Sequence, residues 1–337
     1  MEWIVFLPVL ISMLIVAFAL PKWIRKAKKI GLIWEDMNKY GHPKNVAGSG
    51  GLVVVTAFML SVLLYVAIKT FVLKTEVSNL ETFALLTTII IAAGIGFVDD
   101  LFGWVHGGMS AKLRVFLAVV AAIPLMVINA GHSIVDVPFL GATNLGFFYA
   151  LIIIPLGVGF AIVTYNILAG FNGLETGQGI IILGFLSFVA YLTGSLGLSI
   201  IGLSMTAGLI VFYFYNKIPA QVFPGDVMTY SIGALIAGMA ILGNFEKIAL
   251  FVVIPYIVEA GLKLRGKLKK QSFGVPNKDG SLEMPYDKIY GLEHLAIKVL
   301  KKIKGKVYEK DIVYLIFAVQ IIICLAALLI FRGTLFI

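Results

Sequence analysis

The sequence predicts an all-α polytopic membrane protein with about ten transmembrane helices. Of its 337 residues, 60% are hydrophobic and only 13% are charged, whereas a soluble domain is roughly 45–50% apolar and about 25% charged. The apolar residues form long blocks, such as 53–68 and 312–331, without the alternation that is typical of a transmembrane β-barrel. The composition therefore excludes a soluble globular enzyme, a disordered chain and a collagen-like fibre.

Windows of about 20 apolar residues locate the spans. In chain order we expect them near 3–21, 47–68, 82–98, 112–129, 146–165, 177–194, 197–215, 227–243, 246–263 and 312–331. The N-terminal sequence, Met1-Glu2-Trp3, lacks the positive charge that begins a cleavable signal peptide. The first block is therefore predicted to be a retained span.

The distribution of Lys and Arg among the connections predicts the topology. If residues 21–46 are cytoplasmic, 23 of the 27 Lys and Arg residues lie on the cytoplasmic side. The four on the other side are Lys69, Lys74, Lys247 and Arg332. Cytoplasmic connections carry the excess of basic residues in membrane proteins, so both termini are expected outside. We attribute the net charge of +9 to topology and to anionic lipid headgroups, not to nucleic acid.

The chain is expected to form a single integral membrane domain, 1–337, with one long cytoplasmic loop at 264–311. Asp279-Gly280 predicts the turn of a hairpin within this loop. Beyond it, apolar residues recur with helical spacing at Ile289, Leu292, Leu295, Ala296, Val299, Leu300 and Ile303. This pattern favours an amphipathic helix in the headgroup layer, although packing against other protein explains it nearly as well.

Polar residues cluster at three predicted cytoplasmic ends of spans. Asp99 and Asp100 end the third span, and adjacent carboxylates near lipid are costly unless a cation balances them. They predict magnesium binding or proton transfer near phosphate; the alternative is that one N-caps the next segment and the other is solvated. The single cysteine, Cys324, excludes a cysteine-based metal site, and the four histidines are too scattered for a zinc motif.

The second cluster, 166–179, contains Asn166, Asn172, Glu175 and four glycines. Such a loop can hold a nucleotide through its backbone and an asparagine amide, whereas a merely flexible connection would not need so many hydrogen-bonding groups. The third cluster is 223–226, where Asp226 alone would be interpreted as an N-cap. Together with Lys112, these clusters supply ligands for one divalent metal and a cation for phosphate.

At these residues the sequence resembles the polyprenyl-phosphate N-acetylhexosamine-1-phosphate transferase superfamily, in particular its dolichyl-phosphate GlcNAc-1-phosphotransferase branch. Residues 96–100, 166–175 and 223–226 carry the resemblance, with weaker matches at 36–39 and 282–286. It implies a ten-helix homodimeric enzyme that transfers a sugar-1-phosphate, most simply GlcNAc-1-phosphate, from a UDP-sugar to a polyprenyl (dolichyl-type) phosphate. UMP is released, in the first membrane step of glycan assembly such as N-glycosylation. The implied location is the plasma membrane or an ER-type membrane, with the active site facing the cytoplasm.

The resemblance also assigns roles by position. Asn166 and Asp226 would bind Mg²⁺, for which Mn²⁺ could substitute. Asp99 and Asp100 would have acid–base or metal-supporting roles, and Lys112 would contact phosphate. Because the second pKa of a phosphate monoester is about 6, little need for a base remains at neutral pH. In the nucleotide site, uracil would lie between Gly170 and Phe223 and would pair with Asn172.

One departure concerns the sugar. The dolichyl branch has a run of Arg and His before a proline in the last cytoplasmic loop, where the N-acetyl sugar is recognised, but residues 271–276 here are Gln-Ser-Phe-Gly-Val-Pro. Gln271 and Asn277 remain as candidate sugar-binding residues. A neutral hydrogen bond contributes roughly 0.5–1.5 kcal/mol, so we expect an N-acetylhexosamine donor with looser selection among epimers.

Two other classes of protein were weighed. A secondary transporter would place polar or broken-helix residues near the bilayer midplane, usually in related halves, whereas here the clusters lie at the cytoplasmic ends and no paired halves are evident. A non-catalytic lipid-binding membrane protein would not need the complete polar constellation.

Overall fold

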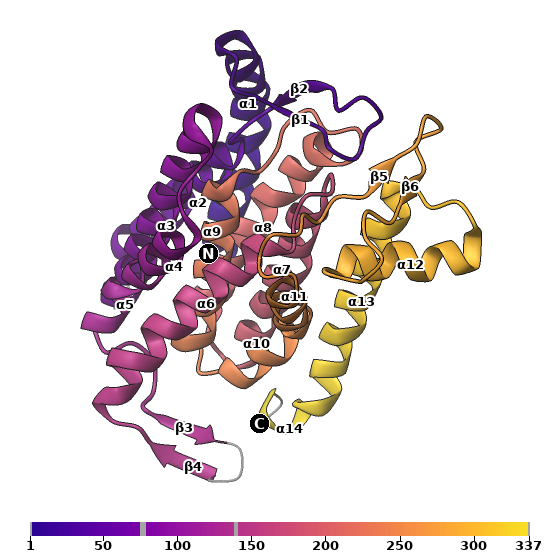
Figure 1. The fold of residues 1–337 in the computed structure, drawn as a ribbon. Coiled ribbons are helices and arrows are strands. Elements are labelled where there is room, and N and C mark those ends of the chain that lie inside the picture. The colour runs from indigo at the N-terminus through magenta and orange to yellow at the C-terminus, as the bar shows by residue number, and fades with distance from the viewer. Residues whose placement is uncertain (1, 75–78, 138–140, 336–337) are drawn as a thin grey trace.

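The computed structural model describes residues 2–74, 79–137 and 141–335, and most of them are helical (Figure 1). Seven helical segments are long and apolar enough to cross a membrane, and the apolar helix α9 (Asp226–Leu242) is shorter. The seven are Trp3–Ile30, Gly51–Leu73, Leu80–Val105, Tyr149–Ile167, Leu174–Leu192, Leu196–Asn216 and Glu309–Ile330. The chain is therefore a polytopic integral membrane protein, as the sequence predicts.

The elements follow one another in this order. The first half contains η1 (Glu2–Phe6), α1 (Leu7–Ile30), β1 (Ile33–Glu35), β2 (Lys44–Ala47), α2 (Gly51–Ala67), η2 (Ile68–Leu73), α3 (Asn79–His106), α4 (Ala111–Val120), α5 (Ile123–Val127), β3 (Ile134–Val137), β4 (Gly141–Asn144), η3 (Tyr149–Ile153) and α6 (Ile154–Ile167). The second half contains α7 (Leu174–Leu192), α8 (Leu196–Asn216), α9, α10 (Glu246–Val252), α11 (Ile254–Arg265), β5 (Val275–Pro276), β6 (Leu282–Glu283), α12 (Leu292–Lys304), α13 (Glu309–Ile330) and α14 (Arg332–Leu335).

Two of the ten predicted spans are interrupted helices. The span expected at 112–129 is divided between α4 and α5, and the one at 246–263 between α10 and α11. Pro124 and Pro255 each lie in the first turn of the second helix of the pair. Because proline has no backbone N–H and clashes with the preceding turn, a helix breaks there and can restart with the proline in its first turn. A search for windows of about 20 apolar residues does not detect such a break.

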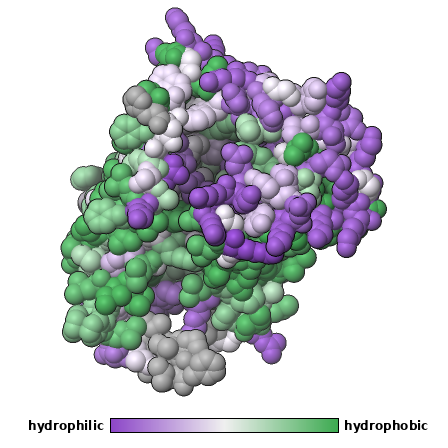
Figure 2. Space-filling model, in the orientation of Figure 1, coloured by the Kyte–Doolittle hydropathy of each residue, from purple (hydrophilic) through white to green (hydrophobic). Residues whose placement is uncertain are grey.

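Helix α9 forms the centre of the bundle, in contact with α2, α3, α6, α7 and α8. Every residue from Val227 to Ile241 is buried. The outer helices instead expose large apolar side chains, among them Phe18, Phe214, Ile322 and Leu329. Figure 2 shows the result, an apolar band around the helices and hydrophilic residues gathered at the end that carries β1, β2, β5, β6 and α12.

Short two-stranded sheets shape the connections. β1 and β2 pair antiparallel in the first connection, and β5 and β6 pair antiparallel on either side of Asp279-Gly280. Helix α12 lies within the region expected to be amphipathic. It buries Ala296, Ile297 and Leu300 in contact with α11 and α13, and it exposes Leu295, Val299 and Ile303. One part of the apolar face thus packs against protein, and the other is free to contact lipid.

Candidate active site

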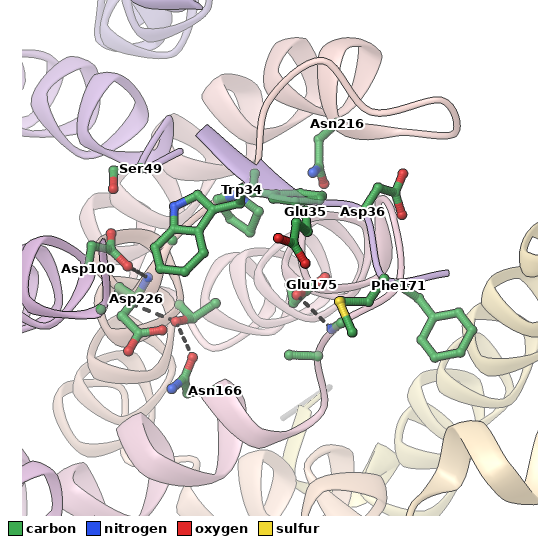
Figure 3. A pocket seen from close by; sticks show the side chains of 18 of the residues that line it. Trp34, Glu35, Asp36, Ser49, Asp100, Asn166, Phe171, Glu175, Asn216 and Asp226 are labelled. Atoms are coloured by element: carbon green, nitrogen blue, oxygen red, sulfur yellow. Dashed lines mark hydrogen bonds between the residues drawn. The ribbon is translucent and has the colours of Figure 1, made fainter. Parts of the chain in front are cut away.

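A cavity of about 670 Å³ lies where five segments of the chain meet. Its lining comes from residues within 33–49, 100–104, 166–175, 216–229 and 271–273. Six of the ten predicted site residues line it: Asp100, Asn166, Gly170, Phe223, Asp226 and Gln271. Figure 3 shows Asp100, Asp226 and Asn166 on one side, Asp36, Glu175 and Phe171 on the other, and Trp34 and Glu35 between them. The fold therefore brings together motifs that are up to about half the chain apart.

Asp100 fixes the start of α9. Its Oδ1 accepts a hydrogen bond from the backbone N–H of Asp226 at 2.7 Å, and its Oδ2 lies 3.5 Å from the N–H of Val227. A Cβ at position 225 would collide with Asp100 Oδ2, so glycine permits this close approach. Asp100 thus caps the start of α9 and not the segment that follows it in the chain, and Asp99 is buried, so the alternative of a local cap and a solvated carboxylate is wrong. The capped helix presents Asp226 to the cavity.

Asp99 is buried and pairs with Arg114 behind the cavity wall. Arg114 Nη2 donates to Asp99 Oδ1 at 3.1 Å, and the N–H of Met109 donates to the same oxygen at 2.7 Å. Lys112, the residue expected to contact phosphate, is exposed and does not line the cavity. Successive helical residues turn by about 100°, so residues 112 and 114 project from different faces of α4. Arg114 is the cation that faces the carboxylates.

Asn166 stands near the end of α6, beside α9. Its Oδ1 accepts a hydrogen bond from Thr229 Oγ1 at 2.8 Å. Thr229 follows Asp226 by three residues in α9, so the two side chains are neighbours on the same face of that helix. Three carboxylates and one guanidinium gather at this end of the cavity, which leaves an excess of negative charge. Carboxylate and amide oxygens are the ligands that Mg²⁺ takes from proteins, often only one or two carboxylates together with substrate phosphates. Asp226 and Asn166 fit that description.

The loop after α6 is held by side chains from distant segments. The N–H of Gly170 donates to Glu175 Oε1 at 3.1 Å, and Asn38 Nδ2 donates to the carbonyl of Gly170 at 2.7 Å. Asn172 is buried and does not line the cavity. Its Nδ2 donates to Asp36 Oδ2 at 2.8 Å, and Asp36 lines the cavity in its place. Gly170 and Phe223, the expected neighbours of uracil, both lie in the wall.

Gln271 and Phe273 close the cavity from the last connection. The ring of Phe273 lies against Gly170, where a Cβ would be 2.8 Å from Phe273 Cε1. The N–H of Gly274 donates to Asn38 Oδ1 at 3.1 Å. Asn277, the second expected sugar-binding residue, lies in the β5–β6 hairpin, where its Nδ2 donates to Ser281 Oγ at 3.0 Å. Asn277 does not line the cavity.

A buried polar cluster beneath residues 271–273 was not foreseen from the sequence. Glu259 and Lys263 of α11 pair at 3.3 Å, and Lys263 also donates to Ser272 Oγ at 2.5 Å. Glu293 and His294 of α12 are fully buried beside them. Burial raises the pKa of Glu293 and lowers the pKa of His294 to about 4. The signal in the sequence was the presence of the charged residues Glu259 and Lys263 on the buried face of α11.

A second cavity of about 610 Å³ lies between α4, η3, α6, α9, α10 and α11. Its lining is almost entirely apolar and includes Val115, Phe160, Ile236 and Leu250. The two cavities share α6, since Asn166 lines the first while Val163, Thr164 and Tyr165 line the second. A hydrocarbon chain could therefore lie in the second cavity with its polar end at Asn166.

The sequence is similar to a known protein family and to several named enzymes. Residues 82–244 match the model of glycosyl transferase family 4. A Saccharolobus solfataricus protein named as a UDP-N-acetylglucosamine–dolichyl-phosphate N-acetylglucosaminephosphotransferase is 34% identical over 329 residues, 96% of each chain. A Dictyostelium discoideum protein with that activity in its name is 31% identical over 66% of this chain and 62% of its own. A Streptococcus agalactiae phospho-N-acetylmuramoyl-pentapeptide-transferase is 29% identical over 74% of this chain and 76% of its own.

Proposed function

Because the chain belongs to the polyprenyl-phosphate N-acetylhexosamine-1-phosphate transferase superfamily, within glycosyl transferase family 4, we propose that it transfers GlcNAc-1-phosphate from UDP-GlcNAc to dolichyl phosphate. The observation that carries the proposal is the single cavity that Asp100, Asn166, Asp226, Gly170 and Phe223 line together. The carboxylate and amide oxygens can hold a metal-bound diphosphate, and the aromatic ring of Phe223 can stack on a nucleobase.

In the proposed reaction, an oxygen of the lipid phosphate attacks the β-phosphorus of UDP-GlcNAc. The bond between that phosphorus and the oxygen bridging to the α-phosphate breaks, and UMP leaves with the electron pair. The sugar stays on the transferred phosphate, so the product is dolichyl-diphosphate-GlcNAc. Because both reactants are anions, positioning and charge neutralisation should supply most of the catalysis.

We propose Mg²⁺ as the metal, held by Asp226 and Asn166 and supported by Asp100 through the start of α9. When bound, the ion neutralises diphosphate charge and stabilises the leaving UMP. The chain's own part is to present these oxygens in fixed geometry, which Thr229 does for Asn166 and Asp100 does for Asp226. Arg114 pairs with Asp99 behind the cavity wall and so balances part of the charge of the acidic cluster, while Lys112 lies outside the lining.

The apolar second cavity supports a lipid acceptor. A dolichyl chain is a long branched hydrocarbon, and a groove with an apolar wall can receive it because the chain then exchanges lipid tails for side chains that are equally apolar. With the chain between α4, α6 and α9, the phosphate would reach the polar end of α6 at Asn166. We further propose ten crossings with the first cavity at the cytoplasmic face, and a homodimer in the plasma membrane or an ER-type membrane.

Purified protein in detergent, supplied with Mg²⁺, dolichyl phosphate and UDP-GlcNAc, tests the proposal. We expect UMP release and a lipid-linked GlcNAc, both absent when dolichyl phosphate is omitted. Replacing UDP-GlcNAc by UDP-GalNAc or UDP-glucose measures sugar selection. Exclusive use of UDP-glucose would refute the N-acetyl sugar. Failure to release UMP from any UDP-sugar would refute the transferase and leave a transporter or a non-catalytic lipid-binding protein.

A further inference from the structure

The charge of the cavity wall is opposite to what an anionic substrate requires. Five carboxylate side chains line the cavity: Glu35, Asp36, Asp100, Glu175 and Asp226. Within the part of the chain that the structure describes, Lys44 is the single lysine or arginine in that lining. A nucleotide diphosphate and a lipid phosphate both bring negative charge to this wall. Since one divalent ion offsets only part of that charge, a further cation should be needed to hold the phosphates.

Lys44 is available for this role because it forms no ion pair with any carboxylate in residues 2–74, 79–137 and 141–335. It stands opposite Glu35 across the β1–β2 ladder, but none of the ion pairs found among the described residues includes Lys44. Arg114 is engaged by Asp99, and Lys39 by Glu309. The Lys44 ammonium is thus an exposed, unpaired cation at a largely acidic cavity.

The backbone that carries Lys44 is fixed to the proposed nucleotide site. The carbonyl of Ala47, in the same strand, accepts a hydrogen bond from the N–H of Phe223 at 2.8 Å, and the N–H of Ala47 donates to Gln221 at 3.1 Å. Lys44 lies three residues from Ala47, about 10 Å along an extended strand. That separation is comparable to the distance from a nucleobase to its own diphosphate. One strand can therefore lie beside the base at Ala47 and reach the diphosphate at Lys44.

We propose that Lys44 binds the phosphate oxygens of the substrate at this cavity, in the first place the diphosphate of the UDP-sugar. The inference rests on the proposed function for the identity of the substrate, but not for the chemistry of the contact. An ammonium on a flexible stem binds phosphate as a point charge. The interaction should therefore weaken as ionic strength rises.

Binding of UDP and of uridine to the full-length protein in detergent tests the proposal. A hydrogen bond to a charged group contributes about 1.5–3 kcal/mol, so Lys44→Gln should raise the Kd for UDP about tenfold or more. The Kd for uridine should change less than twofold. Lys44→Arg should restore most of the UDP affinity, and Lys28→Gln, which removes an exposed lysine of α1 outside the lining, should match the unchanged protein.

The neighbouring carboxylate gives a control of opposite sign. Glu35→Gln should leave the affinity for UDP unchanged or raise it. If Glu35→Gln instead lowers the affinity for UDP as much as Lys44→Gln does, both variants disturb the β1–β2 ladder and the proposal is overturned. If the KM for dolichyl phosphate rises in Lys44→Gln while UDP affinity is unchanged, the lysine binds the lipid phosphate instead. Unchanged values for both substrates would refute phosphate binding by Lys44. UDP binding requires no turnover, so it can be measured even if the unchanged protein transfers no sugar phosphate. Failure of transfer would count against the proposed function, whereas the UDP-binding result decides the role of Lys44.

Discussion

Asp226 and Asn166 come from the start of α9 and the end of α6, and each is oriented by a neighbour. We expect Asp226→Asn and Asn166→Ala to reduce transfer by about 10²–10³, since losing a metal ligand weakens charge stabilisation worth several kcal/mol. Initial rates across a range of Mg²⁺ concentrations test this, because a weakened metal site should need more Mg²⁺. Asp279→Asn, at an exposed carboxylate of the hairpin, is the control. Near-normal turnover by Asp226→Asn would contradict the assignment.

His294 predicts a pH dependence of stability. Burial lowers its pKa to about 4 from 6.5, so the unfolded chain binds the proton more readily than the folded one. The stability that depends on neutral His294 is complete above pH 6.5 and falls as the pH falls toward 4. The Lys263 ammonium of α11 also lowers this pKa, and the raised pKa of Glu293, in the same helix as His294, acts in the opposite sense on stability.

The variant His294→Gln isolates this contribution. Thermal unfolding of the detergent-solubilised protein, measured between pH 4 and 7, should show a shallower loss of stability on acidification in His294→Gln than in the unchanged protein. Identical slopes would mean that His294 is not buried in its neutral form. Glutamine keeps a hydrogen-bonding side chain of similar length, so a general failure to fold is not expected from a lost contact alone.

The types of residue that form the site could be predicted from the sequence better than the direction in which each side chain points. The acidic pair, Asn166 and Asp226 were identified because their chemistry is specific and their motifs are compact. Lys112 was assigned to phosphate by the resemblance and Arg114 was not considered, because nothing in the sequence tells which face of α4 is directed toward Asp99. Asn172 was assigned to uracil, yet its amide is taken by Asp36, a residue 136 positions earlier. Such choices depend on long-range contacts, which a single sequence does not contain.

Residues 271–274 pack against the loop after α6, and a single methyl group added at Gly170 should disrupt this contact. Gly170 has φ +104 and packs under Phe273, so Gly170→Ala adds both backbone strain, of about 1–3 kcal/mol, and a clash. We expect the KM for UDP-GlcNAc to rise more than the KM for dolichyl phosphate. Steady-state kinetics with each substrate varied in turn measures the difference.

Two further variants separate strain from the clash. Gly280 also has a positive φ, +81, but the Cβ that Gly280→Ala adds would have nothing within 4 Å, so this variant adds backbone strain without a clash and should affect stability alone. In Gly170→Ala/Phe273→Leu the smaller side chain should relieve part of the clash, so the double variant should be less impaired than the sum of the single effects. Additive effects would show that Phe273 and Gly170 do not act together.

Connections were foreseen where they use specific turn residues and missed where they depend on tertiary pairing. Asp279-Gly280 marks the β5–β6 turn from sequence alone, because a dipeptide of this kind favours the backbone that a tight hairpin needs. The β1–β2 ladder has no such signal. Its strands, at 33–35 and 44–47, are three and four residues long, and β2 is completed by hydrogen bonds from Phe223 and to Gln221.

The two ends of the bundle carry different chemistry. The connections that contain the acidic, asparagine-rich and 271–273 segments meet at the first cavity. At another site, Tyr65, Lys69, Glu81, Ser195 and Leu242 line a small cavity of about 170 Å³. The sequence assigns these two sets of connections to opposite sides of the membrane, from the distribution of basic residues alone. Leu242, before α10, lines the small cavity, whereas residues 271–273, after α11, line the first, so α10 and α11 together lead from one set of connections to the other.

Site-directed labelling tests this topology. With Cys324 replaced, single cysteines at Ser133 and Lys278 should react with a membrane-impermeant maleimide from opposite sides of intact cells or sealed vesicles. Ser133 lies just before β3, in a connection expected outside, while Lys278 lies in the β5–β6 hairpin beside the first cavity. Lys278→Cys should be labelled only after the membrane is permeabilised, because 23 of the 27 basic residues are assigned to its side and basic connections remain in the cytoplasm. Labelling of both positions from the outside would mean that the interrupted pair between them, α10–α11, enters the membrane without crossing it. Failure of α4–α5 to cross would instead exchange the sides on which the two positions are labelled.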